Sequence, residues 1–353
     1  MQEEKRIPVI DLSAWTQRTP SAGGTTSSDD ERRGVVELVG KACTSVGFFA
    51  ITNHGVNSTR LESLWQSARD FFDLPAPVKL QSKTNNETEY PYGYEQSETL
   101  VVGKQLDQGV KSDSLLPPPD QKETFSLGPN NPLAGMPPRR FPSQPPELQE
   151  ALEEYFQEME HLATTLLEIF ALALDLPQDW FQNKMTRHMS ALRLLNYFAT
   201  DKNASADDKT EIVRAGAHSD YGALTILKAG GPGLQVKWKD GEWVHVPFME
   251  DSFVVNLGDL MQRWTNDKWV STLHRVVVVP TSGADGGAQR RQSIAYFCNV
   301  NGDTPVETLP TCIDEDHPLK YPKVLAKDHL MAKHLASMRH GEPSEKADGH
   351  DEL

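Results

Sequence analysis

His218 and Asp220 lie two residues apart, directly before the apolar run of residues 223–227. Side chains at positions i and i+2 of an extended strand point to the same face. An imidazole and a carboxylate would then project side by side into one pocket, where they could bind a metal ion or act together as a general base. A structural role is the alternative, because a His-x-Asp spacing arises often by chance.

A third candidate ligand, His274, stands at the start of the apolar run 276–279. Strands that are distant in sequence can face each other across the interior of a roll. Two histidines and one carboxylate make up the facial triad that binds Fe(II) and leaves positions open for substrate and O₂. Zinc accepts the same ligands in a tetrahedral site. Without a metal, His218 and Asp220 would cap a strand and His274 would be a hydrogen-bonded core residue.

The segment RRQSIAYFCNV (290–300) reads as a strand whose alternation places Arg291, Ser293 and Phe297 on one face. A guanidinium that enters a strand interior needs an anionic partner, because a buried unpaired charge is strongly unfavourable. Its planar fork beside a hydroxyl suits a carboxylate. That carboxylate could belong to a ligand or to a structural Asp or Glu.

The second half of the chain shows a regular succession of short apolar segments separated by Gly, Asp and Asn turns or polar loops. This pattern predicts an antiparallel barrel or double-sheet roll. The segments are 190–198, 223–228, 233–237, 252–258, 273–279 and 292–298.

The first half alternates shorter elements with loops. Strands are expected at 7–12 and 46–56, and apolar periodicity predicts helices at 32–45, 59–73, 146–175 and 323–338. Residues 17–31 are expected to form a mobile loop, residues 80–145 a lid or a wrap around a site, and residues 340–353 a disordered tail.

Composition excludes several classes of protein. The formal net charge is −15 and no basic stretch occurs, so a nucleic-acid-binding surface is not expected. No run of 18 apolar residues is present, which argues against a membrane span. Three widely spaced cysteines fit a reducing compartment, and no signal-peptide core is visible, so a cytoplasmic location is expected. The C-terminal HDEL is an ER-retention address and leaves the ER as an alternative.

Seven segments follow one another along the chain: IPVIDLS, GFFAITNHGV, LRLLNY, AHSDYGALTIL, GGPGLQV, VVNLGDLMQRWTNDKWVSTLHRVV and RRQSIAYF. In this order they resemble the iron(II)/2-oxoglutarate-dependent dioxygenases of the isopenicillin N synthase-like group. The similarity to the microbial, thymine-hydroxylase-like branch rests on LRLLNY, HSDYG and SIAYFCN.

The resemblance implies a mainly β fold with flanking helices, built on a distorted double-stranded β-helix (jelly-roll). Residues 6–125 are expected to form an N-terminal dioxygenase region packed on a jelly-roll core at 186–303. Residues 146–175 and 323–338 would supply the supporting helices.

The resemblance also assigns roles to residues. His218, Asp220 and His274 match the iron ligands of the family, and Arg291 and Ser293 match the pair that binds the distal carboxylate of 2-oxoglutarate. Tyr197 matches a tyrosine that hydrogen-bonds the same carboxylate. The family usually continues that tyrosine with proline, whereas Phe198 and Ala199 follow here.

The implied reaction uses Fe(II), 2-oxoglutarate and O₂, with ascorbate as an optional reductant, and releases succinate and CO₂ while a substrate C–H bond is oxidised. The expected substrate is small and planar or heteroaromatic. It would contact Arg193, which alternates with Tyr197 along one strand, together with Tyr221 and Phe297. In the alternative interpretation, the two rings pack the barrel and Arg193 forms a buried ion pair.

Two other functions stay open from the sequence. An oxidase of the same fold would use Fe(II) and O₂ without 2-oxoglutarate, giving ring closure or desaturation. A non-catalytic binding protein would have no use for a complete ligand set. The sequence does not identify the substrate or the oligomeric state.

Overall fold

A computed structural model describes residues 5–16, 29–83, 92–96, 122–132, 136–199, 212–279 and 290–339. The predicted disordered tail 340–353, with its HDEL terminus, lies outside the described residues. Most of the predicted mobile loop at 17–31 and much of the predicted lid or wrap at 80–145 also lie outside them.

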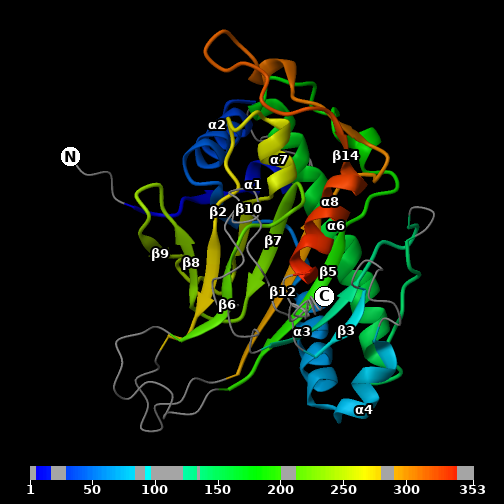
Figure 1. Ribbon diagram of the computed structural model, residues 1–353. Coiled ribbons are helices and arrows are strands. Elements are labelled where there is room, and N and C mark those ends of the chain that lie inside the picture. Colours follow the sequence, from blue (N-terminus) through cyan, green and yellow to red (C-terminus); the bar gives the residue numbers. More distant parts are fainter. Residues whose placement is uncertain are drawn as a thin grey trace, which may run out of the picture.

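Two β-sheets form the centre of the molecule (Figure 1). Neighbouring strands pair antiparallel, except that β1 runs parallel to β2. The larger sheet has eight strands in the order β1 (Val9–Asp11), β2 (Phe48–Thr52), β10 (Phe253–Leu257), β7 (Leu224–Ala229), β12 (Arg291–Cys298), β5 (Ala191–Tyr197), β4 (Lys122–Leu127) and β3 (Gly93–Glu95). The smaller sheet has four, in the order β6 (Val213–His218), β11 (His274–Val277), β8 (Leu234–Lys237) and β9 (Trp243–His245).

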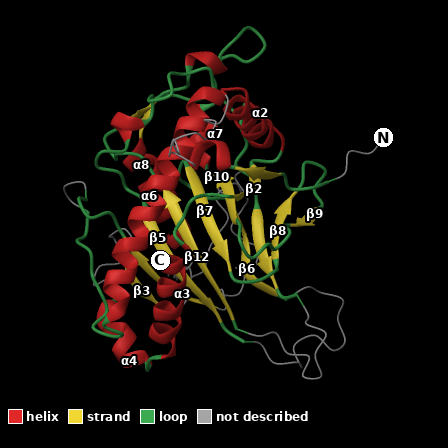
Figure 2. Ribbon diagram, turned by 180° about the vertical axis from the view of Figure 1, so that it is seen from behind, coloured by secondary structure: helices red, strands yellow, loops and turns green. Residues whose placement is uncertain are grey.

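Helices cover one face of the larger sheet, and Figure 2 shows α3 and α6 lying across its strands. A two-stranded ribbon, β13 (Pro305–Val306) and β14 (Val324–Leu325), precedes the last helix. The helices are α1 (Ser13–Thr16), α2 (Asp29–Ser45), α3 (Ser58–Asp73), α4 (Ala76–Lys79), α6 (Glu147–Ala173), α7 (Asp259–Trp264) and α8 (Ala326–Arg339), with short 3₁₀ turns η1 (Leu80–Ser82), η2 (Gln182–Lys184) and η4 (Pro310–Cys312).

The larger sheet separates two apolar clusters. The outer cluster joins its helix-covered face to α2, α3 and α6, and includes Phe156, Leu166, Ile294 and Tyr296. The inner cluster lies between the two sheets and includes side chains from both. This two-sheet arrangement confirms the predicted mainly β jelly-roll with flanking helices.

Each of the six apolar segments predicted in the second half corresponds to a strand: β5, β7, β8, β10, β11 or β12. β6, with the sequence VRAGAH, was not among the predicted apolar segments because only small or polar residues follow its first valine. The turn between β7 and β8 ends at Gly233, whose φ is +116° and whose added Cβ would lie 2.4 Å from the Val277 carbonyl oxygen. Glycine is needed there on both counts.

The predicted division between an N-terminal region (6–125) and a core (186–303) stays a prediction. β1, β2 and β3 belong to the same sheet as β5, β7, β10 and β12, and residue 125 falls within β4. None of the described helices combines the length with the apolar composition that a membrane span needs.

Candidate metal centre and cosubstrate pocket

The smaller sheet brings the two candidate histidine ligands together. His218 is the last residue of β6, His274 is the first residue of β11, and the two are cross-strand partners with ring centroids 4.2 Å apart. Asp220 follows two residues after β6 ends. One ligand atom from each of these three residues lies within 4.8 Å of the others. Residues more than 50 positions apart in sequence therefore converge because antiparallel pairing aligns the ends of two strands.

Both imidazoles are oriented by a backbone carbonyl. The Nδ1 atom of His218 lies 2.8 Å from the Gly216 carbonyl oxygen, and Nδ1 of His274 lies 3.2 Å from that of Thr272. With Nδ1–H donating in each case, the Nε2 lone pair is left to bind a metal ion. This backbone orientation of a ligand histidine is the usual outer-shell arrangement in metal sites.

Asp220 is held through one of its two oxygens. Its Oδ2 accepts hydrogen bonds from Thr225 Oγ1 at 2.6 Å and from Asn256 Nδ2 at 2.7 Å. Its Oδ1 lies 3.9 Å from His274 Nε2, on the side of the histidines. The carboxylate is thus prepared to offer one oxygen to a metal ion. Neither Thr225 nor Asn256 was predicted, although an asparagine inside the apolar run 252–258 is a visible signal.

The charge states of the cluster also suit a metal. Burial alone would raise the pKa of Asp220, but the neighbouring His274 and His218 and the two hydrogen bonds outweigh it, so the pKa lies below its usual value. Burial, together with His218, lowers the pKa of His274 to about 4. At neutral pH the cluster then offers one carboxylate and neutral imidazole, the deprotonated state that metal binding requires. Two nitrogens and one oxygen fit Fe(II) in a facial triad.

The inner face of the larger sheet carries a series of cross-strand rows that lead away from this cluster. The row nearest to Asp220 pairs Phe297 with Thr225, and the row farthest from it contains Arg291. From near to far, the rows are Ala191–Phe297–Thr225, Ser126–Arg193–Ala295–Leu227, Thr124–Leu195–Ser293–Ala229 and Lys122–Tyr197–Arg291.

Arg291 is buried at the far end of these rows. Its guanidinium makes two long hydrogen bonds, of 3.4 and 3.3 Å, to the Gly231 carbonyl oxygen and lies 5.3 Å from the ring centroid of Tyr197. Among the described residues, no Asp or Glu forms an ion pair with it, so the structural ion pair left open by the sequence is not observed there. Burial lowers the pKa of Arg291, which reflects the cost of keeping this cation away from water.

Two predicted neighbours of Arg291 are close to it. Ser293 is buried in the adjacent row, and Tyr197 is the cross-strand partner of Arg291 on β5. A third neighbour, Arg214 of β6, was missed by the sequence analysis. It is buried, and burial together with the positive charge of Arg291 lowers its pKa. Strand alternation could have pointed to it in the sequence, because Arg214 precedes His218 by four residues on one strand and alternation places both on the same face. Two buried arginines therefore lie near each other at this end of the barrel.

Comparisons with known proteins agree with this chemistry. Residues 7–149 match the family described as the N-terminal domain of non-haem dioxygenase in morphine synthesis, and residues 190–300 match the 2OG-Fe(II) oxygenase superfamily. A curated relative from Talaromyces stipitatus, the 2-oxoglutarate-dependent dioxygenase tropC, is 30% identical, with 86% of this chain and 89% of that protein covered. The chain belongs to the 2OG-Fe(II) oxygenase superfamily.

Solved structures support the same family. A full-length Neurospora crassa protein in complex with alpha-KG and 5-formyluracil is similar with a TM-score of 0.79 and 25% identity, covering 95% of this chain and 98% of that one. JOX2 in complex with 2OG, Fe and JA gives a TM-score of 0.69 at 26% identity, covering 92% and 83%. This chain is an oxidoreductase that uses Fe(II) and 2-oxoglutarate, as predicted. The use of ascorbate as an optional reductant stays a prediction.

Two of the three predicted substrate residues, Phe297 and Arg193, belong to the two rows nearest to the metal cluster. Arg193 is half-buried and inward-facing, and its guanidinium carbon lies 5.6 Å from the ring centroid of Phe297. Its Nε donates to Ser126 Oγ at 2.8 Å, and its Nη2 lies 3.9 Å from Glu95 Oε2. Tyr221 is half-buried and directly follows Asp220. The sequence left open an ion pair of Arg193 without naming its partner, and the structure shows Glu95 in that position.

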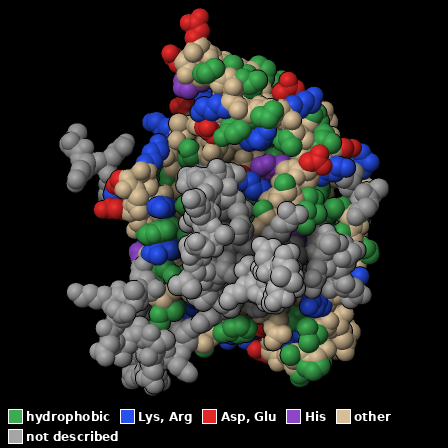
Figure 3. Space-filling view, viewed as in Figure 1, with side chains coloured by type: hydrophobic (Ala, Val, Ile, Leu, Met, Phe, Trp, Pro, Cys, Tyr) green, Lys and Arg blue, Asp and Glu red, His purple; other side chains and the backbone are tan. Residues whose placement is uncertain are grey.

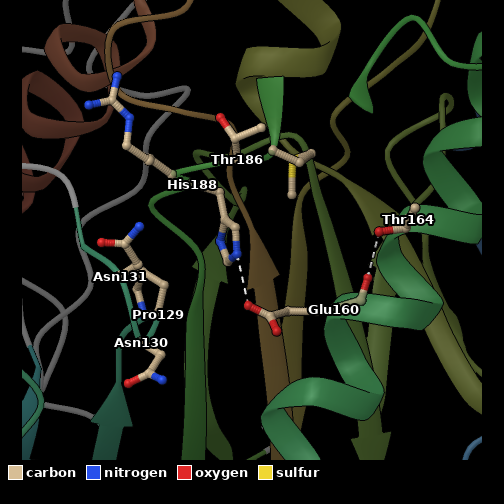
Figure 4. A pocket seen from close by; sticks show the side chains of 9 residues that line it. Pro129, Asn130, Asn131, Glu160, Thr164, Thr186 and His188 are labelled. Carbon is tan, nitrogen blue, oxygen red and sulfur yellow. Dashed lines mark hydrogen bonds and ion pairs between the residues drawn. The ribbon is translucent and has the colours of Figure 1, made fainter. Parts of the chain in front are cut away.

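A pocket that is separate from the metal cluster lies outside the barrel, between α6 and the chain leading into β5 (Figure 4). His188 Nε2 and Glu160 Oε1 are 2.9 Å apart in its wall, and the ring of His188 stacks near Phe156. Figure 4 shows Asn130 and Asn131 on the opposite side of this opening. The His188–Glu160 pair ties α6 to the start of β5, and none of the predicted site residues lines this pocket.

Proposed function

We propose that this chain is a small-molecule hydroxylase in which His218, Asp220 and His274 hold the iron. The support is their convergence at the aligned ends of β6 and β11, with each side chain oriented by hydrogen bonds that leave one ligand atom for the metal. The bound iron supplies the oxidising power for C–H cleavage once O₂ and 2-oxoglutarate are present. The protein fixes the ligand geometry and excludes water.

In this proposal Arg291, Ser293 and Tyr197 bind the distal carboxylate of 2-oxoglutarate. The observation that carries it is the buried Arg291 guanidinium, which has only weak hydrogen bonds to Gly231 and no acidic partner among the described residues. A cation in that position is strongly destabilised unless an anion joins it. A carboxylate would accept from both guanidinium nitrogens and from the serine hydroxyl.

Turnover of 2-oxoglutarate tests the proposal directly. Purified protein with Fe(II) should release succinate from 2-oxoglutarate slowly without substrate and faster with one. Fe(II)- and O₂-dependent oxidation of a substrate without consumption of 2-oxoglutarate would instead support the oxidase alternative. A protein that binds neither divalent metal nor 2-oxoglutarate would be a binding module.

The substrate is proposed to lie between the rings of Phe297 and Tyr221, with Arg193 at its edge. Two rings and a cation fixed by Ser126 suit a small planar molecule with hydrogen-bonding groups at its rim. A structure of a full-length Neurospora crassa protein in complex with alpha-KG and thymine, 26% identical with a TM-score of 0.78, fits a heteroaromatic substrate class. Hydroxylation, desaturation and ring formation are separated by product analysis.

Substrate contact predicts a particular kinetic signature. In Arg193→Met, Tyr221→Ala and Phe297→Ala, product formation should fall while decarboxylation of 2-oxoglutarate is partly retained. Parallel loss of both activities would show that these residues only support the barrel.

A cytoplasmic location is also proposed, on the basis of three buried cysteines with free thiols. Fractionation of cells that express the full chain would test it against the ER alternative.

A further inference from the structure

Glu95 stands next to the proposed substrate-binding arginine. It is the last residue of β3, and its register partner on β4 is Thr124, whose Oγ1 donates to Glu95 Oε2 at 3.3 Å. The preceding residue, Tyr94, faces the other side of the sheet and donates to Glu123. Strand alternation therefore turns Glu95 toward the inner face, where its Oε2 lies 3.9 Å from Arg193 Nη2.

The two side chains differ in exposure in a way that matters for ligand binding. The Arg193 side chain is 13% exposed and the Glu95 side chain 28% exposed, so the carboxylate is the more accessible of the two. They belong to β5 and β3, the two strands that flank β4 near this edge of the sheet. A ligand edge that reaches Arg193 therefore also comes near Glu95.

This juxtaposition changes what the arginine can recognise. A carboxylate bound to Arg193 would lie within a few ångströms of a second carboxylate, and like charges repel strongly when water is partly excluded. A neutral edge with an N–H beside a C=O has no such conflict, because the carboxylate accepts from N–H while the guanidinium donates to C=O. A lactam, an imide and a primary amide all present such an edge.

Resting on the proposed function, we propose that Glu95 is a specificity-determining residue: with Arg193 it selects substrates with a neutral donor–acceptor edge and rejects carboxylates. This deepens the substrate assignment, since Arg193 alone would suit a planar carboxylate equally well. Rejection by a fixed like charge is a common way to obtain specificity.

The test compares ligands that differ only in charge at the recognised group. Benzamide with benzoate, and 1-naphthamide with 1-naphthoate, are measured by ligand-observed NMR on the anaerobic protein loaded with Fe(II) and saturating 2-oxoglutarate. Saturation keeps the acids out of the 2-oxoglutarate site. We expect the wild type to bind the amide of at least one pair roughly 10-fold or more tighter than the acid, given the size of like-charge penalties in partly buried sites.

Glu95→Gln is the decisive variant, because it removes the charge and keeps the shape. We expect it to lower the amide-to-acid affinity ratio by about 10-fold, chiefly through tighter binding of the acid. Glu158→Gln is the matched control: it removes a carboxylate on α6 that pairs with Arg60, and it should leave the ratio unchanged.

Two results would overturn the inference. The first is that the wild type shows no preference for the amide, which includes the case in which it binds neither the amide nor the acid. The second is that the amide-to-acid affinity ratio is unchanged in Glu95→Gln. An unchanged ratio with weaker binding of both ligands would make Glu95 only a support for Arg193. Slow succinate release without any probe is measured in parallel. If it is present and the ratio prediction fails, only the role of Glu95 is wrong; if 2-oxoglutarate neither binds nor turns over, the proposed function itself fails.

Discussion

The two faces of the larger sheet are built from the same strands but differ in chemistry. On β12, Ile294, Tyr296 and Cys298 face the helices and belong to the outer apolar cluster. Arg291 and Ser293, on the opposite face of the same strand, are also buried. The outer side chains are stabilised by packing within the protein, whereas the inner polar pair, Arg291 and Ser293, receives little stabilisation from the residues around it. A buried polar surface with few internal partners is the mark of a ligand site.

The outer surface of the molecule supports the same contrast. In Figure 3, acidic and basic side chains are interspersed over the described part of the face shown. Inside the barrel, the buried guanidinium of Arg291 instead lies near the buried Arg214 and near Tyr197, and no Asp or Glu among the described residues forms an ion pair with Arg291. A buried arginine without an acidic partner among the described residues, Arg291, therefore distinguishes the inside of the barrel from this mixed outer surface.

The largest expected effect comes from removing a metal ligand. His218→Ala, Asp220→Ala and His274→Ala should each lower turnover below detection, because two ligands cannot hold iron in the required geometry. Thermal unfolding of the metal-free proteins should change little, since the three residues lie at strand ends beside the core. Full activity with unchanged iron content in any of them would contradict the assignment.

Arg291→Gln should weaken 2-oxoglutarate binding by about 2–5 kcal/mol, the usual cost of removing one partner of a buried charged hydrogen bond. Anaerobic titration calorimetry measures this directly. Unchanged affinity would exclude Arg291 from the cosubstrate site. In the absence of 2-oxoglutarate, the substitution should lower the free energy of unfolding by less than it lowers the binding free energy. It could even raise the free energy of unfolding, because a buried charge without an acidic partner among the described residues is removed.

Neighbouring residues on β12 sharpen the comparison between faces. Ile294→Ala, on the helix side, should lower the free energy of unfolding by about 2–5 kcal/mol and leave 2-oxoglutarate affinity unchanged. Ser293→Ala, on the inner side, should do the reverse: a loss of roughly 1.5–3 kcal/mol in 2-oxoglutarate binding with little change in stability. Urea unfolding and titration calorimetry on both variants check this. If both substitutions change stability and 2-oxoglutarate affinity equally, the proposed difference between the two faces of the sheet is wrong.

The smallest effect is expected for Asn256→Ala, which removes one of the two hydrogen bonds to Asp220 Oδ2. Loss of such an outer-shell partner typically weakens metal binding about 10–100-fold. The measurement is a Co(II) titration of the metal-free protein. Ser252→Ala, just before the same strand, is the control, because its hydroxyl donates to the Met249 carbonyl instead. A metal affinity equal to that of the wild type would mean that Thr225 alone orients the carboxylate.

The sequence by itself determined the strand succession, the long helix α6 and the types of the ligand and cosubstrate residues. Apolar periodicity is a local property, and a His-x-Asp spacing or an Arg-x-Ser alternation on one strand is visible without knowledge of any partner. The family resemblance rests on the same local segments. β6 was missing from the predicted apolar segments because its residues are small or polar. Its pairing with β11, rather than an apolar pattern of its own, makes it a strand.

Only the tertiary structure decided which distant residues meet. The register between β6 and β11 placed His218 beside His274, and the order β12–β5–β4–β3 placed Glu95 beside Arg193. The pairing of β10 with β7 brought Asn256 and Thr225 onto one oxygen of Asp220. Cross-strand pairing joins residues that no local pattern relates, because the choice of neighbouring strands depends on packing of the whole sheet. The sequence showed which residue types could carry the chemistry, and the fold determined which of them lie next to one another.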